Sequence, residues 1–190
     1  MVKPKLLLHS CCGPCSTAVI ERLKENYNIT IFFYNPNIMG FAEYEKRKEA
    51  QVAFLDGYNA SLEWEEKIAF QEGPYAVTQF AELVKGLENE AEGGKRCDLC
   101  FRHRLEETAK LAHLNAYDCF STTLSVSPHK DFQKISRFGN QLSLAYQVAF
   151  LDENFKKKDG YQRSIQLSKE YKLYRQTYCG CKFINGGYER

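Results

Sequence analysis

The sequence predicts an α/β protein built as three layers around a mostly parallel sheet, with a helical C-terminal part. Short apolar segments rich in β-branched residues alternate along the chain with segments whose apolar residues recur every three to four positions. This alternation is typical of parallel strands joined by helices. The 190 residues are 44% hydrophobic and 26% charged, which suits one buried core. We therefore expect a single domain over residues 1–190.

The first half of the chain begins with a compact apolar segment that runs into the cysteine-rich turn Ser10-Cys11-Cys12-Gly13-Pro14-Cys15. A second strand is indicated where β-branched and aromatic residues precede the turn signal Asn35-Pro36-Asn37. The predicted elements of this half are a strand at 5–9, a helix at 16–27, a strand at 29–34, a helix at 41–55 that ends at Asp56-Gly57, and a short strand at 61–65.

The second half continues the alternation. Asp131 is a plausible N-cap for a long helix, and Gly139 weakens that helix locally. The predicted elements are a helix at 74–87, a polar loop at 88–96, a helix from 97 to about 114, a strand at 117–123, a loop at 124–130, a helix from 131 through 151, and a helix at 162–171. Ligands of such folds bind beyond the carboxyl ends of the strands, which is where the first cysteine cluster lies.

Composition and charge exclude several classes of protein. Disorder, collagen and coiled coils do not fit the balance of apolar and charged residues. Eight cysteines in 190 residues are too few for a secreted disulfide scaffold. The N-terminus has only a three-leucine apolar run, and the other apolar runs are too short to span a membrane. We expect a cytoplasmic protein without a membrane partner, in which clustered thiols bind metal or perform redox chemistry.

The cysteines fall into three motifs and one isolated residue. Cys12 and Cys15, like Cys97 and Cys100, are three residues apart, so both sulfurs of a pair lie on one face if the pair opens a helix. A helix N-terminus favours the thiolate that a metal requires. Two separated CxxC pairs indicate a zinc site or an iron-sulfur cluster.

The number of cysteines argues against a purely structural zinc. A closed zinc site takes four ligands, and Cys11, Cys179 and Cys181 would remain in motif-like positions. The terminal Cys-Gly-Cys suggests a second ligand set or an easily reduced redox pair. A structural zinc and simple burial stay as alternatives for the CxxC pairs. Cys119, in a predicted strand, is interpreted as a small buried hydrophobe.

Two further side chains are candidates for site chemistry. The four histidines lack metal-ligand spacing, so each is interpreted as a surface or core residue; His129, in a turn between a strand and a helix, stands where such folds contact ligands. Asp98 lies inside the second CxxC pair and either reaches a metal or compensates the helix dipole.

Several motifs together resemble the cobalamin-independent epoxyqueuosine reductase family. They are SCCGPCS, CDLCFRHRLEETA, TTLSVSPHKD, DGYQRSIQLSKEYKLYRQ and YCGCKF, in the family's order and spread over nearly the whole chain. The resemblance implies an oxidoreductase that converts epoxyqueuosine to queuosine at the wobble position of the tRNA anticodon, the last step of queuosine biosynthesis. It also implies a fold like the HUP-type nucleotide-binding domain of PP-loop ATPases. Pro14 removes a backbone donor from the turn that would cradle phosphate, which argues against ATP binding.

The resemblance also implies a metal site. A 4Fe-4S cluster would be held by Cys11, Cys12, Cys97 and Cys100, with Cys179 and Cys181 as a nearby redox pair or as ligands of an additional iron ion. The spacing alone nominates Cys15 in place of Cys11, and Cys15 could instead bind the adjacent metal. No cobalamin is expected.

The implied reaction removes one oxygen atom as water and so requires two electrons and two protons. A cluster supplies electrons singly, and an open iron site could polarise the epoxide oxygen. The electron donor is not identified by the sequence. Asp98, His129 and Asp131 are candidate proton donors, with helix capping as the alternative role.

A tRNA partner requires cations for phosphates and aromatic rings for bases. Basic residues interleave with tyrosines in the tail, although a solvated helix face would look similar. The candidate contacts are Arg102, Arg104, Lys157 within the run 156–158, Arg163 and Arg175. Two other functions remain open, a cytosolic thiol or iron-sulfur electron-transfer protein and a structural-zinc RNA-binding module.

Overall fold

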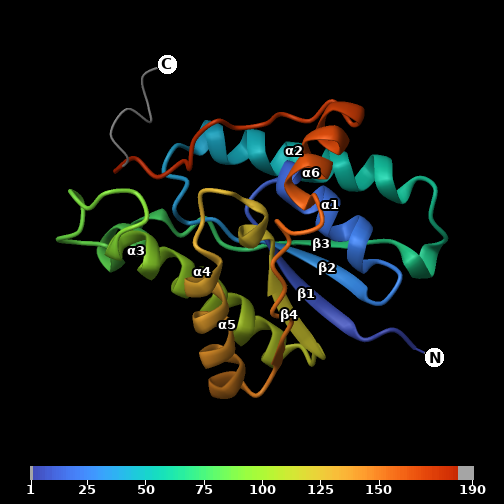
Figure 1. The fold of residues 1–190 in the computed structure, drawn as a ribbon, viewed down its shortest axis with the longest axis horizontal. Helices are drawn as coiled ribbons and strands as arrows, with labels where there is room; N and C mark the ends of the chain where they lie inside the picture. The colour runs from blue at the N-terminus through green and yellow to red at the C-terminus, as the bar shows by residue number, and fades with distance from the viewer. Residues whose placement is uncertain (1, 184–190) are drawn as a thin grey trace.

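Five parallel strands form the centre of the molecule, in the order β3-β2-β1-β4-β5. The computed structural model describes residues 2–183. Helices α1, α2 and α6 cover one face of the sheet, and α4 and α5 cover the other (Figure 1). The predicted α/β class with three layers is therefore confirmed.

The strands are short and the helices long. The strands are β1 (Lys5–Ser10), β2 (Asn28–Phe33), β3 (Ala69–Glu72), β4 (Cys119–Thr122) and β5 (Ala149–Phe150). The helices are α1 (Gly13–Leu23), α2 (Phe41–Asn59), α3 (Val77–Leu83), α4 (Lys95–Leu114), α5 (Phe132–Tyr146) and α6 (Gly160–Glu170), with 3-10 turns η1 (Trp64–Glu66) and η2 (Thr123–Val126). Within residues 2–183, no helix combines the length and apolar character needed to cross a bilayer.

The central strand β1 is buried on both faces, as a strand of a parallel sheet covered by helices must be. Leu6, Leu7 and Leu8 are all fully buried. Leu7 belongs to the core beneath α4 and α5, whereas its two neighbours belong to the core beneath α1 and α2. Successive side chains of a strand point to opposite faces, so this one segment supports both helical layers.

The register of the sheet brings three loops to one edge. β1 pairs with β2 from Lys5↔Asn28 to Ser10↔Phe33, and with β4 up to His9↔Thr122. The three strands therefore end nearly level. The chain leaves β1 toward one face of the sheet and η2 follows β4, so the gap between β1 and β4 is the topological switch point at which such sheets bind ligands.

Two element predictions in the first half are wrong. The helix predicted to stop at Asp56-Gly57 continues to Asn59, and Gly57 lies within it where α2 packs on Tyr171, whose ring carbons would lie 3.2 Å from an added Cβ. The strand predicted at 61–65 is absent: this stretch leads into η1, and the strand is β3, which pairs with β2.

The long helix predicted through residue 151 is also shorter. Asp131 caps α5 as expected, with Oδ1 accepting from the backbone nitrogen of Gln133 at 2.8 Å. The helix ends at Tyr146, because Gln147 adopts a left-handed conformation with φ of 54° and the chain then forms β5. Helix α4 begins at Lys95, inside the predicted polar loop.

The C-terminal part is one helix followed by an extended segment. After α6, residues 171–183, here named the strap, run across α2 toward the start of α4 without forming a further helix (Figure 1). The predicted helix at 162–171 corresponds to α6. The strap brings the last two cysteines back toward the sheet edge.

Candidate functional site

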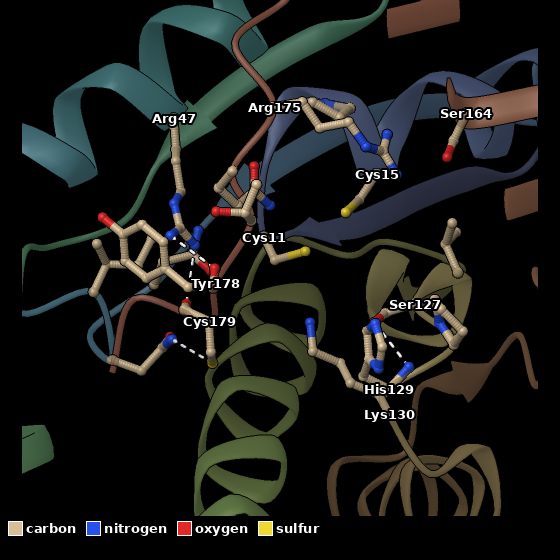
Figure 2. Close-up of a pocket in the computed structure, with 18 of the residues that line it drawn as sticks. Cys11, Cys15, Arg47, Ser127, His129, Lys130, Ser164, Arg175, Tyr178 and Cys179 are labelled. Carbon is tan, nitrogen blue, oxygen red and sulfur yellow. Dashed lines mark hydrogen bonds between the residues drawn. The ribbon is translucent and has the colours of Figure 1, made fainter. Parts of the chain in front are cut away.

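A cavity of about 620 Å³ opens at the carboxyl edge of the sheet. Its walls come from the turns after β1, β2 and η2, and from α6 and the strap, so segments far apart in the sequence line one space (Figure 2). The residues on which its chemistry depends are Cys11, Cys15, Arg104, His129, Lys130 and Cys179.

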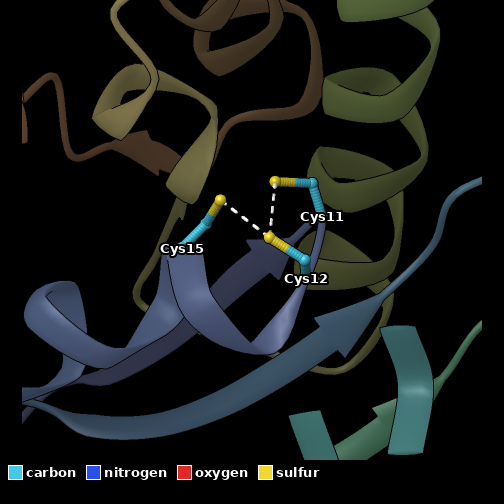
Figure 3. Close-up of side chains that lie close together, drawn as sticks. All are labelled: Cys11, Cys12 and Cys15. Atoms are coloured by element: carbon cyan, nitrogen blue, oxygen red, sulfur yellow. Dashed lines mark hydrogen bonds between the residues drawn. The ribbon is translucent and has the colours of Figure 1, made fainter. Parts of the chain in front are cut away.

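Three cysteines meet at the floor of this cavity. The sulfurs of Cys11, Cys12 and Cys15 all lie within 4.8 Å of one another (Figure 3). Cys12 is the N-cap residue of α1, with an extended backbone, and Pro14 occupies the first turn, where a missing N–H is tolerated. Because the strand ends directly before the helix begins, all three thiols project into one volume. This thiol triad could hold a metal ion.

The three thiols do not ionise alike. Hydrogen bonds from Cys12 and Cys15 hold the pKa of Cys11 well below its ordinary value, and the positive charge of Lys130 acts in the same direction. Burial raises the pKa of Cys12 to about 12, and hydrogen bonding to Cys11 raises the pKa of Cys15. The two neighbouring thiols therefore favour the thiolate form of Cys11. A metal ion would replace their protons.

Arg104 places an uncommitted positive group beside the sulfurs. Its side chain is buried, Nε donates to the Cys100 carbonyl oxygen at 3.3 Å, and Nη1 lies 3.5 Å from Asn35 Oδ1. Its Nη2 has no hydrogen-bond partner among the described residues. Although burial opposes it, the negative charges of Cys100 and Cys179 raise the pKa of Arg104. An anionic metal-sulfur group fits this orphaned donor and the sulfur ligands around it.

Lys130 adds a second cation. Its side chain points into the cavity toward Cys11 (Figure 2). Burial lowers its pKa, but the charges of Cys11, Cys179 and Cys15 together raise the pKa of Lys130 overall. The turn that carries it is tied down by Lys156, whose Nζ donates to the Lys130 carbonyl oxygen at 3.0 Å.

The second CxxC pair opens α4, as the spacing predicts. Cys97 Sγ accepts from the Gly93 backbone nitrogen at 3.2 Å, and the side chain packs against the core that contains Cys11 and Cys12. Burial raises the pKa of Cys100 to about 12. Among the described residues, only the thiol triad brings three metal-ligating groups within 4.8 Å, so this pair stands apart from it. The 4.8 Å separation suits the ligands of a single metal ion. An iron-sulfur cluster contains several metal ions, so its cysteine ligands lie farther apart than the ligands of one ion.

The strap delivers the remaining cysteines. Cys179 lines the cavity, and its Sγ lies 4.0 Å from Asn37 Nδ2. Cys181 is buried with Cys100 in a small cluster beside Phe80 and Val84. Of the seven cysteines in the three motifs, Cys11, Cys15 and Cys179 therefore line the cavity, and Cys100 and Cys181 pack together in the separate small cluster. Cys119 is buried at the start of β4, which confirms its interpretation as a core residue.

The other residues predicted for the site are divided between the cavity and the surface. His129 and Arg175 line the cavity together with Arg104. Asp98 does not line it: its Oδ1 lies 2.8 Å from Lys134 Nζ, in an ion pair between α4 and α5.

Three predicted phosphate contacts lie outside the cavity. Arg102 and Lys157 are exposed. Arg163 is held by Glu21, with Nη2 to Oε1 at 2.6 Å and Nε to Oε2 at 2.8 Å.

Sequence reasoning missed Arg47 and Lys130. Lys130 directly follows His129 in the turn between β4 and α5. The strand-turn-helix pattern therefore identified the correct loop, but it indicated His129 and not Lys130. Arg47 lies in a helix rich in Glu and Lys, where nothing distinguishes it from a solvated residue, yet only 3% of its surface is exposed.

A parallel α/β sheet with a thiol triad, a second cysteine pair and cations at its switch point defines a class of thiol-dependent metal-binding or redox enzymes. A family model described as "Epoxyqueuosine reductase QueH" matches residues 6–186. The chain therefore belongs to the epoxyqueuosine reductase QueH family, a family of oxidoreductases.

Individual relatives agree with this assignment. The epoxyqueuosine reductase QueH of Streptococcus pyogenes is 40% identical over 182 residues, covering 96% of this chain and 71% of that protein. The Staphylococcus epidermidis protein of the same name is 41% identical, over 95% of this chain and 76% of its own length. The Thermotoga maritima protein is 36% identical, over 94% and 88%. The family match over residues 6–186 spans all three cysteine motifs.

Proposed function

We propose that this protein reduces epoxyqueuosine to queuosine at the wobble position of tRNA. The thiol triad at the floor of the switch-point cavity carries this proposal, because it places metal-ligating sulfur where a parallel α/β fold binds its substrate. Membership of the QueH family supplies the substrate class. In this proposal residues 1–190 act as one iron-sulfur tRNA-modification domain in the cytoplasm.

The cysteines are assigned as the family resemblance implies. Cys11, Cys12, Cys97 and Cys100 would hold a 4Fe-4S cluster, and Cys15 would bind an additional iron ion at the cavity side. When bound, these groups supply electrons singly and polarise an oxygen atom. The unpartnered Nη2 of Arg104 supports this assignment, since it is a buried positive donor beside the sulfurs.

The protein's own groups would manage charge and protons. Removing the epoxide oxygen breaks two C–O bonds and consumes two electrons and two protons, and the oxygen leaves as water. Lys130 points into the cavity toward Cys11 (Figure 2) and would stabilise the negative charge that develops on the epoxide oxygen. His129, on the same turn, is favoured over Asp98 as proton donor because it lines the cavity. Cys179 and Cys181 are proposed as the redox pair, and an external electron donor completes each turnover.

The tRNA would approach from the open side of the cavity. Arg175 lines the cavity with its guanidinium 5.3 Å from the Tyr161 ring centroid, which suits a phosphate or a splayed base beside the site. Arg102, Lys157 and Arg163 are proposed as more distant backbone contacts.

The deciding experiment combines metal analysis with turnover. Protein purified anaerobically should contain iron and acid-labile sulfide, and should convert epoxyqueuosine-containing tRNA when a reductant is supplied. Cys15→Ala should lose iron without losing sulfide, whereas Cys179→Ala should retain both and lose turnover. Iron-loaded, reduced protein that leaves this tRNA unchanged would exclude the proposed reaction. Zinc as the sole metal would exclude the cluster.

A further inference from the structure

A single buried ion pair on α2 holds the strap. The Nε atom of Arg47 donates to Glu43 Oε1 at 2.6 Å, one helical turn earlier. The other two nitrogens face the strap: Nη1 donates to the Cys179 carbonyl oxygen at 2.9 Å, and Nη2 donates to the Tyr178 carbonyl oxygen at 3.1 Å. Figure 2 shows both contacts at the edge of the cavity.

The strap also contacts the other member of the pair. The Tyr174 hydroxyl donates to Glu43 Oε2 at 2.9 Å. The Arg47 guanidinium lies 5.2 Å from the ring centroid of Tyr178, within cation–π range. Three strap residues thus depend on one Arg-Glu pair.

The glycine between the last two cysteines fits this arrangement. Gly180 has φ of +91°, and an added Cβ would lie 3.1 Å from Arg47 Nη2. Its carbonyl oxygen accepts from the Met39 backbone nitrogen at 3.2 Å. A side chain at this position would be strained by its backbone conformation and would press on the guanidinium. The Cys-Gly-Cys spacing therefore has a structural cause besides the chemistry of its sulfurs.

The Arg47–Glu43 pair, here named the anchor, controls the position of Cys179. A buried charge pair is stable only when its remaining donors are used, and all three Arg47 nitrogens have acceptors. Two of those acceptors belong to the peptide groups that flank the Cα atom of Cys179, so the guanidinium fixes the backbone from which that sulfur projects into the cavity. Because the side chain is bonded to this backbone, any shift of the Tyr178 and Cys179 carbonyl groups also moves the Cys179 sulfur.

We propose that Arg47 is a positioning residue that sets the location of Cys179 at the mouth of the cavity, with Glu43 holding the guanidinium and Gly180 giving it room. The consequence for turnover rests on the proposed function. The anchoring itself does not, because it can be measured without any substrate.

The first experiment measures how readily Cys179 is alkylated. Full-length protein, prepared anaerobically with its metals, is pulsed with iodoacetamide, and each cysteine is quantified by mass spectrometry. Hydrogen bonds to a charged group strongly oppose local opening, so Arg47→Gln should raise the Cys179 rate by about tenfold or more. The rate at Cys119, which reports global opening, should stay unchanged. An unchanged Cys179 rate would overturn the proposal.

Two further variants test the same anchor. Gly180→Ala disturbs the contact between the strap and the Arg47 guanidinium from the strap side, and should also raise the rate at which Cys179 is alkylated. If Arg47→Gln fails to fold, this variant tests the proposal in its place. Lys48→Gln is the matched control, because Lys48 is the next residue of the same helix and pairs with Glu45 and Glu72 instead of with the strap. It should leave the Cys179 rate unchanged, and an increase equal to that of Arg47→Gln would mean that α2 alone is being destabilised.

The second experiment separates positioning from binding. In turnover of epoxyqueuosine-containing tRNA, Arg47→Gln should lower kcat by about tenfold to a hundredfold, as a displaced reacting group does, with KM nearly unchanged. A rise in KM at constant kcat would assign Arg47 to substrate binding instead. If the wild-type protein shows no turnover, the proposed function fails, and the alkylation rates still decide the anchor.

Discussion

The Nδ1 atom of His9 lies 2.8 Å from Thr122 Oγ1, and this contact joins the ends of β1 and β4 beside the cavity. The other ring nitrogen, Nε2, lies 3.0 Å from the Tyr34 carbonyl oxygen. A carbonyl oxygen only accepts, so Nε2 carries the proton and Nδ1 accepts from the Thr122 hydroxyl. His9 is therefore a fully buried neutral imidazole with both nitrogens satisfied, as a core histidine should be, and it links the last residue of β4 to the segment that follows β2.

Removing the Thr122 hydroxyl should weaken the sheet at its switch point. Thr122→Val leaves His9 Nδ1 without a donor and the Leu124 backbone nitrogen without its acceptor, which lies 3.1 Å away. The free energy of unfolding should fall by about 1–3 kcal/mol, the cost of leaving buried polar groups unpaired. Urea denaturation measures this change. Thr122→Ser keeps the hydroxyl and is the control; equal stability of the two variants would refute the role of this contact.

The same histidine predicts how stability depends on pH. Burial, assisted by the charge of Arg104, lowers the pKa of His9 from 6.5 to about 3. The unfolded chain therefore binds a proton near pH 6.5, whereas the folded chain does not until near pH 3. Between these values the free energy of unfolding should fall as the pH falls, by about 1.4 kcal/mol per pH unit from this residue.

Comparing the wild type with His9→Gln isolates this contribution from those of the carboxylates. Denaturation curves at pH 7, 6, 5 and 4 should show that the free energy of unfolding falls more steeply with falling pH in the wild type than in His9→Gln. Above pH 7 the two proteins should have the same pH dependence. Parallel losses in the two proteins would show that His9 takes up its proton in the folded state too.

Gly139 shows how packing reverses a local propensity. In an exposed helix, replacing glycine with alanine adds about 1 kcal/mol of stability. Here an added Cβ would lie 2.2–2.5 Å from carbons of the Phe150 ring, because α5 packs directly on β5. Gly139→Ala should therefore lower the free energy of unfolding by about 1–3 kcal/mol, as overpacking does.

The compensating change tests that cause. Gly139→Ala should lower the free energy of unfolding less in a Phe150→Leu background than in the wild type, because the ring that obstructs the added Cβ is then absent. Thermal unfolding of the four proteins gives the coupling. A coupling near zero would show that the ring is not the obstacle.

The sequence predicted the parts of the fold that depend on local pattern. The run at residues 6–8 is apolar and the run at 29–34 is β-branched or aromatic throughout, so both buried strands were found. The Asp131 cap was found because the side chain and the backbone nitrogens it serves are neighbours in sequence.

Elements that depend on partners were missed. β5 has two residues, and its pairing with β4 identifies it as a strand. Gly57 is a helix stop in local terms, but α2 continues past it at a point where the ring of Tyr171 packs against the glycine.

The candidate site divides in the same way. Spacing located the cysteines, since both CxxC pairs open helices. The sequence could not show which Lys and Arg residues lie beside these cysteines, because a charged residue in a sequence pattern looks the same whether its side chain is solvated or buried. Arg104 was predicted as a tRNA contact with a solvated helix face as the alternative, and the structure buries it to 2% exposure among charged groups that include Cys100 and Cys11. Burial arises from packing among segments distant in sequence, which no local pattern encodes.

Arg175 and Arg163 should differ in their effect on RNA binding. Arg163 is already neutralised by Glu21 at 2.6 Å, whereas Arg175 lines the cavity and its Nη1 lies 3.3 Å from the Ser168 hydroxyl. Arg175→Gln should weaken binding of epoxyqueuosine-containing tRNA and reduce the slope of log affinity against log salt by about one. Arg163→Gln should leave that slope nearly unchanged. Filter binding at several salt concentrations measures both, and equal slopes for the two variants would remove Arg175 from the interface.

The proton donor can be identified by comparing two carriers that differ in position. His129 lines the cavity, whereas Asp98 is paired with Lys134. Loss of a general acid typically slows a reaction by about a hundredfold or more, so His129→Gln should show that decrease in the single-turnover rate. Asp98→Asn breaks a partly exposed ion pair worth at most about 1 kcal/mol and should lower stability slightly while largely preserving the rate. The opposite ranking, with Asp98→Asn the slower enzyme at unchanged iron content, would transfer the role to Asp98 and require that its pair with Lys134 opens when substrate binds.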